Sequence, residues 1–269
     1  MGAGIVQTLA EKGFEVLVYE SYEPARESAQ EKVEKFIRKA AEKGKVSSEQ
    51  SEQSIHRIHW CHDIRELRDS EFVIEAISEK VAAKIELFRQ LDEITHTQVI
   101  LASNTSSISI TRIAASTNKP ELCIGMHFMN PVPLMPLVEI IRGHVTNDLT
   151  YKTTEQLARD LGKTPIESGD YPGFITNRVL MPMINEAIYA LWEGVGTREA
   201  IDQVTKLGMN HPMGPLELAD FIGLDVCLAI LNTLHEGFGD SKYRPCPLLR
   251  KMVDAGHLGR KTGKGFYSY

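Results

Sequence analysis

The sequence predicts an α/β domain over residues 1–170, followed by an all-helical domain over residues 171–269. Two observations support this fold class. Up to about residue 170, strand-like runs of β-branched and aromatic residues alternate with segments of helical periodicity, which is typical of βαβ units around a parallel sheet. After the segment YPGF at 171–174, only helical periodicity remains.

The chain opens with half of a dinucleotide-binding unit. The helix predicted after Gly2 ends near Gly13, and the strand FEVLVYE that follows ends in the acid Glu20. A glycine-rich helix start, a helix and a strand ending in an acid form the second half of a Rossmann-like βαβ unit. Taken alone, such a helix start is more often a plain N-cap than a nucleotide site.

The first strand of that unit is absent from the numbered sequence. The GAG at 2–4 resembles the first glycines of a GxGxxG motif, but no strand precedes it. We favour Gly2 as the last glycine of the motif, because one helix and one strand separate it from Glu20. We therefore expect about ten further residues upstream in the natural protein, enough for one strand and a turn. Without them, the helix after Gly2 should lack support and two strands should have unpaired edges.

The remaining elements of the first domain follow from the same two periodicities. Pro24 suits an early helical position and Gly44 a helix stop. The predicted elements are helices at 24–44, 47–55, 78–94, 108–116 and 150–162, and strands at 14–20, 55–60, 70–77, 98–103, 121–130, 137–143 and 163–170. Polar residues follow several strands, where ligands of parallel sheets bind: Glu20, Glu75, Ser103–Ser107 and His127–Asn130.

The second domain is predicted to consist of helices. Apolar residues at helical spacing mark a helix over 175–192, which Pro182 should kink. Thr197 suits the N-cap of the next helix, and one or two further helices lie within 215–239. A last helix at 247–256 precedes a basic, glycine-rich tail.

Composition argues against several function classes. The formal net charge of -6 disfavours nucleic acid as a partner, and no apolar run approaches the roughly 20 residues that span a membrane. The four cysteines form no CxxC pair, which favours reduced thiols in a cytoplasmic protein. His56, His59 and His62 lie three apart but complete no recognised zinc pattern, so we expect no metal site.

Several motifs together resemble one family. They are SNTSS at 103–107, HFMNPVPLMPLVEII at 127–141, PGFITNR at 172–178, HPMGPLELADFIGLD at 211–225 and GRKTGKGFY at 259–267. In order and spacing they resemble the L-3-hydroxyacyl-CoA dehydrogenases, and in length the chain resembles the short bacterial 3-hydroxybutyryl-CoA dehydrogenases. The resemblance covers nearly the whole chain. It implies a Rossmann-like domain that carries NAD, a helical domain that forms a homodimer, and an acyl-CoA substrate held between them.

The resemblance implies four catalytic residues. His127 matches the family's catalytic histidine, and Glu139 matches the acid that pairs with it. A histidine titrates in the range that alcohol oxidation requires of a base, and a carboxylate on one ring nitrogen fixes its tautomer. Ser106 and Asn177 match the polar residues that bind the substrate's C3 oxygen. From pattern alone, His127 is also consistent with a structural histidine, Ser106 with a turn or helix N-cap, and Asn177 with an ordinary polar position in a first helical turn.

The resemblance also implies the cofactor-binding residues. Glu20 matches the acid that binds the adenosine ribose, which favours NAD over NADP, although the family more often has Asp here. Met1 and Gly2 match the pyrophosphate turn. Positions near the nicotinamide half of NAD are matched by Glu79, Lys84, Asn130 and Lys261, and we expect Ser106 to contact the cofactor as well. From pattern alone, Glu79 and Lys84 are typical of a solvated helix face.

Three hypotheses for function follow. We favour a cytoplasmic, NAD-dependent dehydrogenase of short L-3-hydroxyacyl-CoA thioesters, because all four catalytic residues are retained. Lys43 aligns loosely with a family lysine near the CoA phosphates, although an exposed helix lysine is the simpler interpretation. The alternatives are a non-catalytic structural or binding protein that lost cofactor binding with its first strand, and a dehydrogenase of another hydroxyacid of the gulonate type.

Overall fold

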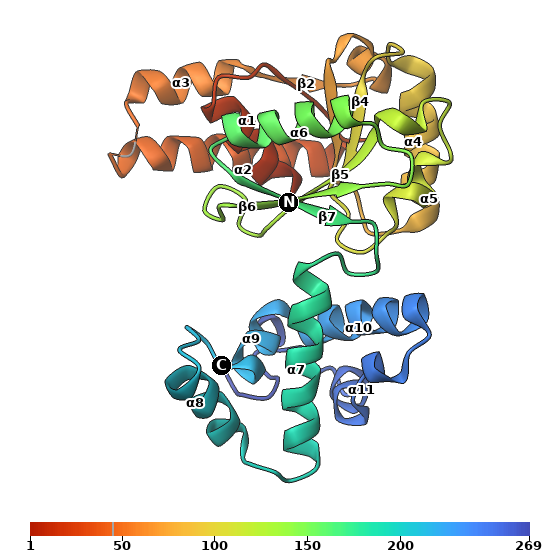
Figure 1. The fold of residues 1–269 in the computed structure, drawn as a ribbon. Helices are drawn as coiled ribbons and strands as arrows, with labels where there is room; N and C mark the ends of the chain where they lie inside the picture. Colours follow the sequence, from red (N-terminus) through yellow and green to blue (C-terminus); the bar gives the residue numbers. More distant parts are fainter. Residues whose placement is uncertain (45) are drawn as a thin grey trace. The chain divides into compact units, whose positions relative to one another are not determined.

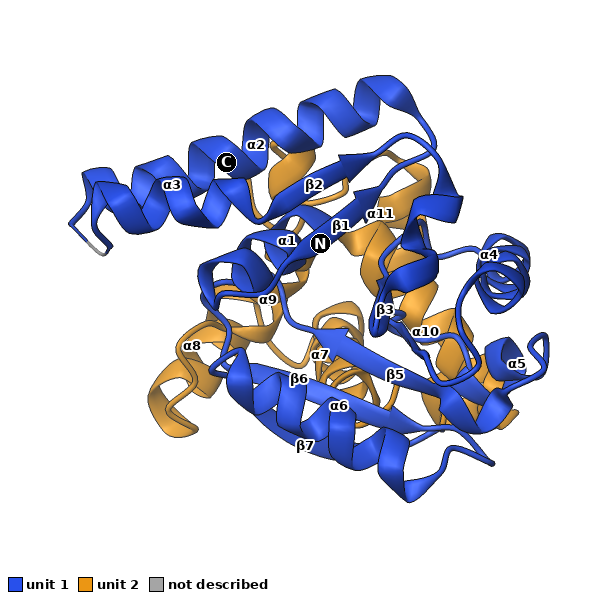
Figure 2. Cartoon of the chain, turned by 90° about the horizontal axis from the view of Figure 1, so that it is seen from above, with its two compact units in different colours: residues 1–170 blue, residues 171–269 orange. Residues whose placement is uncertain are grey.

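The computed structural model describes residues 1–44 and 46–269. Contacts divide the chain into two compact units, unit 1 (Met1–Asp170) and unit 2 (Tyr171–Tyr269), which Figure 2 distinguishes by colour. Unit 1 alternates strands and helices, and unit 2 is built from helices (Figure 1). The predicted fold class, a Rossmann-like α/β domain followed by an all-helical domain, is therefore confirmed.

Unit 1 contains a small sheet and a larger one. The small sheet pairs β1 (Val16–Tyr19) in parallel with β2 (Ile58–Cys61). The larger sheet has the strand order β3 (Phe72–Glu75), β4 (Ile100–Ser103), β5 (Cys123–Phe128), β6 (Leu137–Arg142) and β7 (Thr164–Gly169). The helices are α1 (Gly2–Glu11), α2 (Glu23–Glu42), α3 (Ser48–His56), α4 (Val81–Ile94), α5 (Ile110–Ala114) and α6 (Asp148–Asp160). Each element overlaps the segment predicted for it.

β6 runs antiparallel to β5, whereas the sequence predicted a parallel sheet throughout. The other neighbours in the larger sheet pair in parallel. The segment between β5 and β6, residues 129–136, contains no helix, and a parallel crossover needs about a dozen residues or more. The chain therefore reverses its direction after β5, and this reversal brings two predicted catalytic residues onto neighbouring strands.

α1 is well packed, contrary to the expectation that it would lack support. Its Ile5 and Ala10 are 4% and 0% exposed. Ala10 belongs to a buried cluster with Val16 of β1 and Ile37 of α2. Within the described residues, β1 and β3 do not pair with each other, which agrees with the expected unpaired strand edges.

Helices cover both faces of the larger sheet. Leu101 of β4 packs in a cluster with Phe88 of α4. Its neighbour Ala102 packs in a different cluster with Ile5 of α1 and Ala158 of α6. Because successive side chains of a strand point to opposite faces, these two clusters lie on opposite sides of the sheet. The polar residues that follow β3, β4 and β5 share one edge of the sheet, because these strands are parallel.

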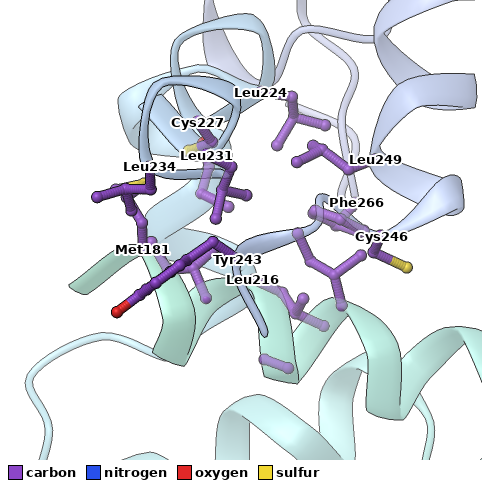
Figure 3. Packing of buried hydrophobic residues seen from close by; sticks show 14 residues of the cluster. Met181, Leu216, Leu224, Cys227, Leu231, Leu234, Tyr243, Cys246, Leu249 and Phe266 are labelled. Atoms are coloured by element: carbon purple, nitrogen blue, oxygen red, sulfur yellow. The ribbon is translucent and has the colours of Figure 1, made fainter. Parts of the chain in front are cut away.

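The helices of unit 2 enclose a separate apolar core. They are α7 (Thr176–Trp192), α8 (Arg198–Gly208), α9 (Pro215–Ile222), α10 (Leu224–Phe238) and α11 (Pro247–Asp254). Figure 3 shows Met181 of α7, Leu231 of α10 and Leu249 of α11 converging with Phe266 of the C-terminal tail. As predicted, the Thr197 hydroxyl caps α8 by accepting a hydrogen bond from the N–H of Ala200.

In the described part of the chain, no single helix is long and apolar enough to cross a membrane. α9 and α10 together reach that length and apolarity, but they are bent by 98° at their junction. Their apolar side chains Leu216, Leu224 and Leu231 are fully buried in the core of unit 2 (Figure 3).

Two buried aspartates hold the C-terminal tail. Asp220 accepts hydrogen bonds from the backbone N–H groups of Phe266 and Tyr267, both at 2.9 Å. Asp202 accepts one from the N–H of Leu216 at 2.9 Å and one from the Tyr267 hydroxyl at 2.8 Å. Tyr267 therefore connects the two carboxylates, and the tail is fixed to both α8 and α9.

Candidate active site

His127 and Glu139 face each other across β5 and β6. The antiparallel register pairs the two residues directly, and His127 Nδ1 lies 2.9 Å from Glu139 Oε2. The side chains of His127 and Glu139 are 10% and 1% exposed. A charge-assisted hydrogen bond is stronger where water is excluded. The arrangement can fix one imidazole tautomer and stabilise the imidazolium that forms when the ring takes a proton.

The turn after β4 is built around the Glu79 carboxylate. Glu79 Oε1 accepts hydrogen bonds from the Thr105 hydroxyl at 2.6 Å, the Ser106 N–H at 2.8 Å and the Ser107 N–H at 3.1 Å. The Ser106 hydroxyl also donates to it, at 3.1 Å. Burial acts to raise the pKa of Glu79, but the Thr105 bond and the Lys84 charge outweigh it and hold this pKa below its ordinary value. Glu79 therefore remains ionised and keeps the turn in place.

Lys84 is buried, whereas its pattern suggested a solvated helix face. Its side chain is 1% exposed, and its Nζ lies 2.6 Å from Glu75 Oε1 and 3.4 Å from Glu79 Oε2. Glu75 is buried as well, and it also accepts hydrogen bonds from the Ser103 hydroxyl and the Ile77 N–H, both at 2.6 Å. One ammonium is thus held between two carboxylates.

The burial of Lys84 follows from its place on α4. Lys84, Phe88 and Leu91 are the buried residues of this helix, and their spacing puts them on one face. A lysine on that face is acceptable because Glu75, at the end of β3, pairs with it. Sequence reasoning named Glu75 among the polar strand ends but did not connect it with Lys84.

Asn104 joins this turn to the end of β5, a role that sequence reasoning missed. Its Oδ1 accepts a hydrogen bond from the N–H of Phe128 at 2.8 Å, and its own N–H donates to the Glu75 carbonyl at 2.8 Å. Phe128 follows His127 directly. The turn that carries Ser106 is therefore tied to the end of the strand that carries His127.

Ser109, and not Ser106, is the N-cap of α5. Its hydroxyl oxygen accepts a hydrogen bond from the N–H of Arg112. The Asp170 carboxylate also binds this helix start, because it accepts hydrogen bonds from the Ser109 hydroxyl at 2.7 Å and the Ile110 N–H at 2.9 Å. The interpretation of Ser106 as a helix cap is therefore wrong, since Ser106 lies in the bend that precedes the cap.

Lys163 ties down the loop between β5 and β6, and sequence reasoning missed it too. Its Nζ donates to the carbonyl oxygens of Val132 at 2.5 Å and Met135 at 3.0 Å. Burial lowers the pKa of Lys163. Asn130, one of the predicted cofactor residues, is exposed in the same loop. A lysine that binds main-chain oxygens leaves no pattern in the sequence that would predict this contact.

The residues predicted to bind the adenosine half of NAD lie at the start of α1 and after the end of β1. α1 begins at Gly2, and among the described side chains none caps its first N–H groups. Glu20 is half-buried, and one of its oxygens accepts a hydrogen bond from the Tyr22 N–H at 3.0 Å. Uncapped N–H groups attract phosphate oxygens, and a carboxylate suits ribose hydroxyls. These residues fit the cofactor.

The other residues predicted to bind the substrate or the cofactor are Lys43, Asn177 and Lys261. Lys43 is exposed at the end of α2. In unit 2, Asn177 is buried in the first turn of α7, and Lys261 forms an ion pair with Asp225 at 2.6 Å.

Within the described residues, no three histidine, cysteine or acidic side chains lie close enough together to hold a metal ion. His59, one of the three closely spaced histidines, lies 3.0 Å from Glu15.

Comparisons with known proteins agree over the whole chain. Residues 1–171 match the 3-hydroxyacyl-CoA dehydrogenase NAD binding domain, and residues 173–269 match the 3-hydroxyacyl-CoA dehydrogenase C-terminal domain. The chain is 56% identical to the probable 3-hydroxybutyryl-CoA dehydrogenase of Bacillus subtilis (strain 168), with 100% of this chain and 94% of that protein aligned. It is 51% identical to the 3-hydroxybutyryl-CoA dehydrogenase of Bradyrhizobium diazoefficiens, with 100% of this chain and 92% of that protein aligned.

A solved structure of a relative has the same fold. The crystal structure of (S)-3-hydroxybutyryl-CoA dehydrogenase from Ralstonia eutropha superposes with a TM-score of 0.98 at 46% identity, covering 100% of this chain and 95% of that one. The family matches, the identity over the full length and the fold thus support the same family assignment. The chain belongs to the 3-hydroxyacyl-CoA dehydrogenase family, and its first 171 residues form that family's NAD binding domain.

Proposed function

We propose that this protein is an NAD-dependent dehydrogenase of short L-3-hydroxyacyl-CoA thioesters, acting on 3-hydroxybutyryl-CoA and catalysing the reverse reduction. The observation that carries the proposal is the His127–Glu139 pair, 2.9 Å apart and shielded from water. Relatives named as 3-hydroxybutyryl-CoA dehydrogenases, up to 56% identical along the whole chain, support the choice of substrate.

His127 is the general base of the oxidation. Glu139 accepts the hydrogen on Nδ1, which gives Nε2 the lone pair that takes the proton of the substrate hydroxyl. As the proton moves, the imidazole becomes an imidazolium, and the buried Glu139 carboxylate stabilises its charge. In the reduction, the same imidazolium returns the proton to the oxygen.

Ser106 and Asn177 bind the C3 oxygen of the substrate. This oxygen gains negative charge while the alcohol is deprotonated, so donors that are already in place stabilise it at little cost in reorganisation. The bonds from the Ser106 and Ser107 N–H groups to Glu79 fix the position of the turn and support such preorganisation, and the Ser106 hydroxyl exchanges its bond to Glu79 for one to the substrate oxygen. The burial of Asn177, which is 7% exposed, supports the same role.

NAD, when bound, supplies the acceptor for the hydride that leaves C3. We infer that Met1 and Gly2 hold its pyrophosphate and that Glu20 holds the adenosine ribose. The carboxylate of Glu20 repels a 2′-phosphate, so we expect NAD to bind in preference to NADP. The residues inferred for the nicotinamide half are Glu79, Lys84, Ser106, Asn130 and Lys261, and Lys43 is inferred for the CoA phosphates.

We infer a homodimer that forms through unit 2. α8 buries little of its own surface, and Val204 and Leu207 on it are 60% and 81% exposed. Met209, just beyond the helix, is 61% exposed. Neighbouring exposed apolar side chains of this kind mark interaction surfaces, and a second copy of the chain offers the same apolar patch.

The compartment that we infer is the cytoplasm. The four cysteines are Cys61, Cys123, Cys227 and Cys246. All are free and buried, and none forms a disulfide. Reduced thiols are typical of proteins from reducing compartments.

The test is the oxidation of NADH by acetoacetyl-CoA, followed by absorbance. We expect turnover by the natural protein and a kcat lowered by about 10²–10⁴-fold in His127→Gln, because the base is lost, with NADH affinity unchanged. The control Glu20→Ala should weaken NADH binding and retain most of kcat at saturating NADH. If the natural protein binds NADH and reduces the oxidised forms of other hydroxyacids, but not acetoacetyl-CoA, the result would favour the gulonate-type alternative. Protein that binds no NADH and shows no turnover would favour a non-catalytic role.

A further inference from the structure

Asp170 binds the start of α5 with both of its carboxylate oxygens, and the proposed chemistry does not use this acid. Its Oδ2 accepts hydrogen bonds from the Ser109 hydroxyl at 2.7 Å and the Thr111 N–H at 2.8 Å, and its Oδ1 accepts one from the Ile110 N–H at 2.9 Å. The first N–H groups of a helix have no partner within the helix, so a carboxylate that accepts them stabilises the helix start. Because Asp170 directly follows β7, it joins the end of this strand to α5.

The start of α5 also packs tightly on β5. Ile110, the first residue of α5, is 1% exposed. A Cβ atom at Gly125 of β5 would lie 3.0 Å from Ile110 Cδ1, which is tighter than ordinary van der Waals contact, so a glycine there lets the helix lie directly against the strand. Gly125 stands two residues before His127 on β5. The helix start that Asp170 binds is therefore fixed against the strand that carries His127.

The turn that carries Ser106 lies between two anchors. Before the turn, the Asn104 side chain accepts a hydrogen bond of 2.8 Å from the end of β5. Within the turn, the N–H of Ile108 donates to the Thr105 hydroxyl at 2.9 Å, and the next residue is Ser109, which Asp170 binds. Only two residues lie between Ser106 and Ser109, so a displacement of the helix start is passed to Ser106 through a short stretch of chain.

We propose that Asp170 is a positioning residue: it fixes the start of α5, and through it the turn that carries Ser106. The carboxylate acts on the reaction only through this turn, by keeping the Ser106 hydroxyl where it can donate to the C3 oxygen of the substrate as negative charge develops. The effect on catalysis rests on the proposed function of Ser106, whereas the effect on the turn does not. The two effects are therefore measured separately.

The first measurement tests the turn without any substrate. Asp170→Asn keeps the size of the side chain, but it removes the charge and turns N–H groups toward the donors of the helix start. We expect the backbone N–H groups of Ser107 and Ile108 to exchange with solvent deuterium about tenfold faster in this variant than in the natural protein. If exchange is faster only at Ile110 and Thr111, Asp170 caps α5 and does nothing more, and the proposal is overturned, whether or not the protein turns over acetoacetyl-CoA.

The matched control is Asp148→Asn. Asp148 also stands at the start of a helix of unit 1, α6, but its side chain is 78% exposed and pairs with Arg142 at 2.7 Å. Removal of its charge should leave the exchange at Ser107 and Ile108 unchanged and kcat within about twofold of the natural value. An equal rise in exchange in both variants would trace the effect to the loss of any negative charge from unit 1 and would overturn the proposal.

The second measurement separates positioning from simple stability. With NADH saturating and the temperature well below Tm, we expect kcat for acetoacetyl-CoA reduction to fall about tenfold in Asp170→Asn, while the KM of acetoacetyl-CoA changes less than about threefold. The loss should appear in kcat because the bond from Ser106 strengthens as the oxygen gains charge. A variant with a lower Tm and an unchanged kcat would assign Asp170 a stabilising role only and would contradict the proposal.

A double variant shows whether Asp170 acts through Ser106. Ser106→Ala removes the hydroxyl and should lower kcat by at least about tenfold. In that background, Asp170→Asn should lower kcat by less than about twofold more, because no donor is left to position. If the two losses multiply, Asp170 acts by another route and the proposal is overturned. If Ser106→Ala alone keeps the natural kcat, the proposed function of Ser106 fails together with the effect on catalysis, and the exchange at Ser107 and Ile108 decides whether Asp170 holds the turn.

Discussion

The buried carboxylates of the two units are put to different uses. In unit 1, Glu139 faces the imidazole of His127 at 2.9 Å. In unit 2, Asp202 and Asp220 accept hydrogen bonds from backbone N–H groups and from the hydroxyl of Tyr267. The first carboxylate lies opposite a group that can gain a proton, and the other two lie opposite neutral donors.

The partner, and not the depth of burial, distinguishes these acids. Glu139 and Asp220 are both 1% exposed. A carboxylate bound to neutral donors holds two segments of the chain together whatever the reaction does. A carboxylate opposite an imidazole can stabilise a charge that appears during the reaction. A buried acid is therefore a candidate for catalysis only when its partner can change its protonation state near neutral pH, as a histidine can and a tyrosine cannot.

The substitution Glu139→Gln should break the catalytic half of this comparison. The amide keeps the size of the side chain but removes the charge, and its NH₂ group can turn toward Nδ1 and favour the wrong imidazole tautomer. We expect kcat for acetoacetyl-CoA reduction to fall by about 10²–10⁴-fold, with the free energy of unfolding changed by less than about 1 kcal/mol. Steady-state kinetics and urea unfolding measure the two effects. A destabilised variant with unchanged kcat would place Glu139 with the structural acids.

Asp202→Asn should produce the opposite result. Asp202 binds the N–H groups of Leu216 and Glu217, at 2.9 and 3.0 Å, at the start of α9. An amide can satisfy one of these donors with its oxygen but presents its own N–H groups to the others. We expect a loss of about 1–3 kcal/mol in the free energy of unfolding, measured in urea, with kcat within about twofold. If kcat falls while stability is retained, unit 2 holds an acid with a role in the reaction.

The order of the elements was predictable because periodicity records which face of each element is buried. The antiparallel direction of β6 was also predictable, since the loop at 129–136 is too short for a parallel crossover. The alternation of strands and helices by itself carries no information on loop length. The spacing of Lys84, Phe88 and Leu91 likewise indicates one helix face, but a lysine there is normally assigned to solvent.

Residue patterns alone do not predict the contacts that assemble the candidate site. The family resemblance implied the pairing of His127 with Glu139, but its geometry depends on the register of β5 and β6, which is set by hydrogen bonds between the strands. The bonds from Lys163 to the carbonyls of Val132 and Met135 depend on main-chain atoms, which every residue has. Asn104 belonged to a recognised motif, yet only the structure shows that its side chain binds the N–H of Phe128.

The smallest effect is expected at Tyr267. It tests the comparison selectively, because the Tyr267 hydroxyl is hydrogen-bonded to Asp202. Burial and the hydrogen bond to Asp202 raise the pKa of Tyr267 above its ordinary value. The unfolded chain loses this proton near pH 10, while the folded protein retains it to higher pH. The contribution of Tyr267 to stability is therefore complete below about pH 10 and is lost as the pH rises through the folded pKa.

We expect Tyr267→Phe to lower the free energy of unfolding by about 0.5–1.5 kcal/mol near pH 8, where the hydrogen bond is lost. Between pH 9 and about 11, its stability should fall less steeply than that of the natural protein, because one of the groups that release protons on unfolding is gone. Asp202→Asn should flatten the same slope in part, since it removes the carboxylate that helps to raise the pKa. If the free energy of unfolding falls equally steeply with pH in all three proteins, Asp202 holds the tail without affecting the titration of Tyr267. The proton-linked pair of His127 and Glu139 in unit 1 would then have no counterpart at Asp202.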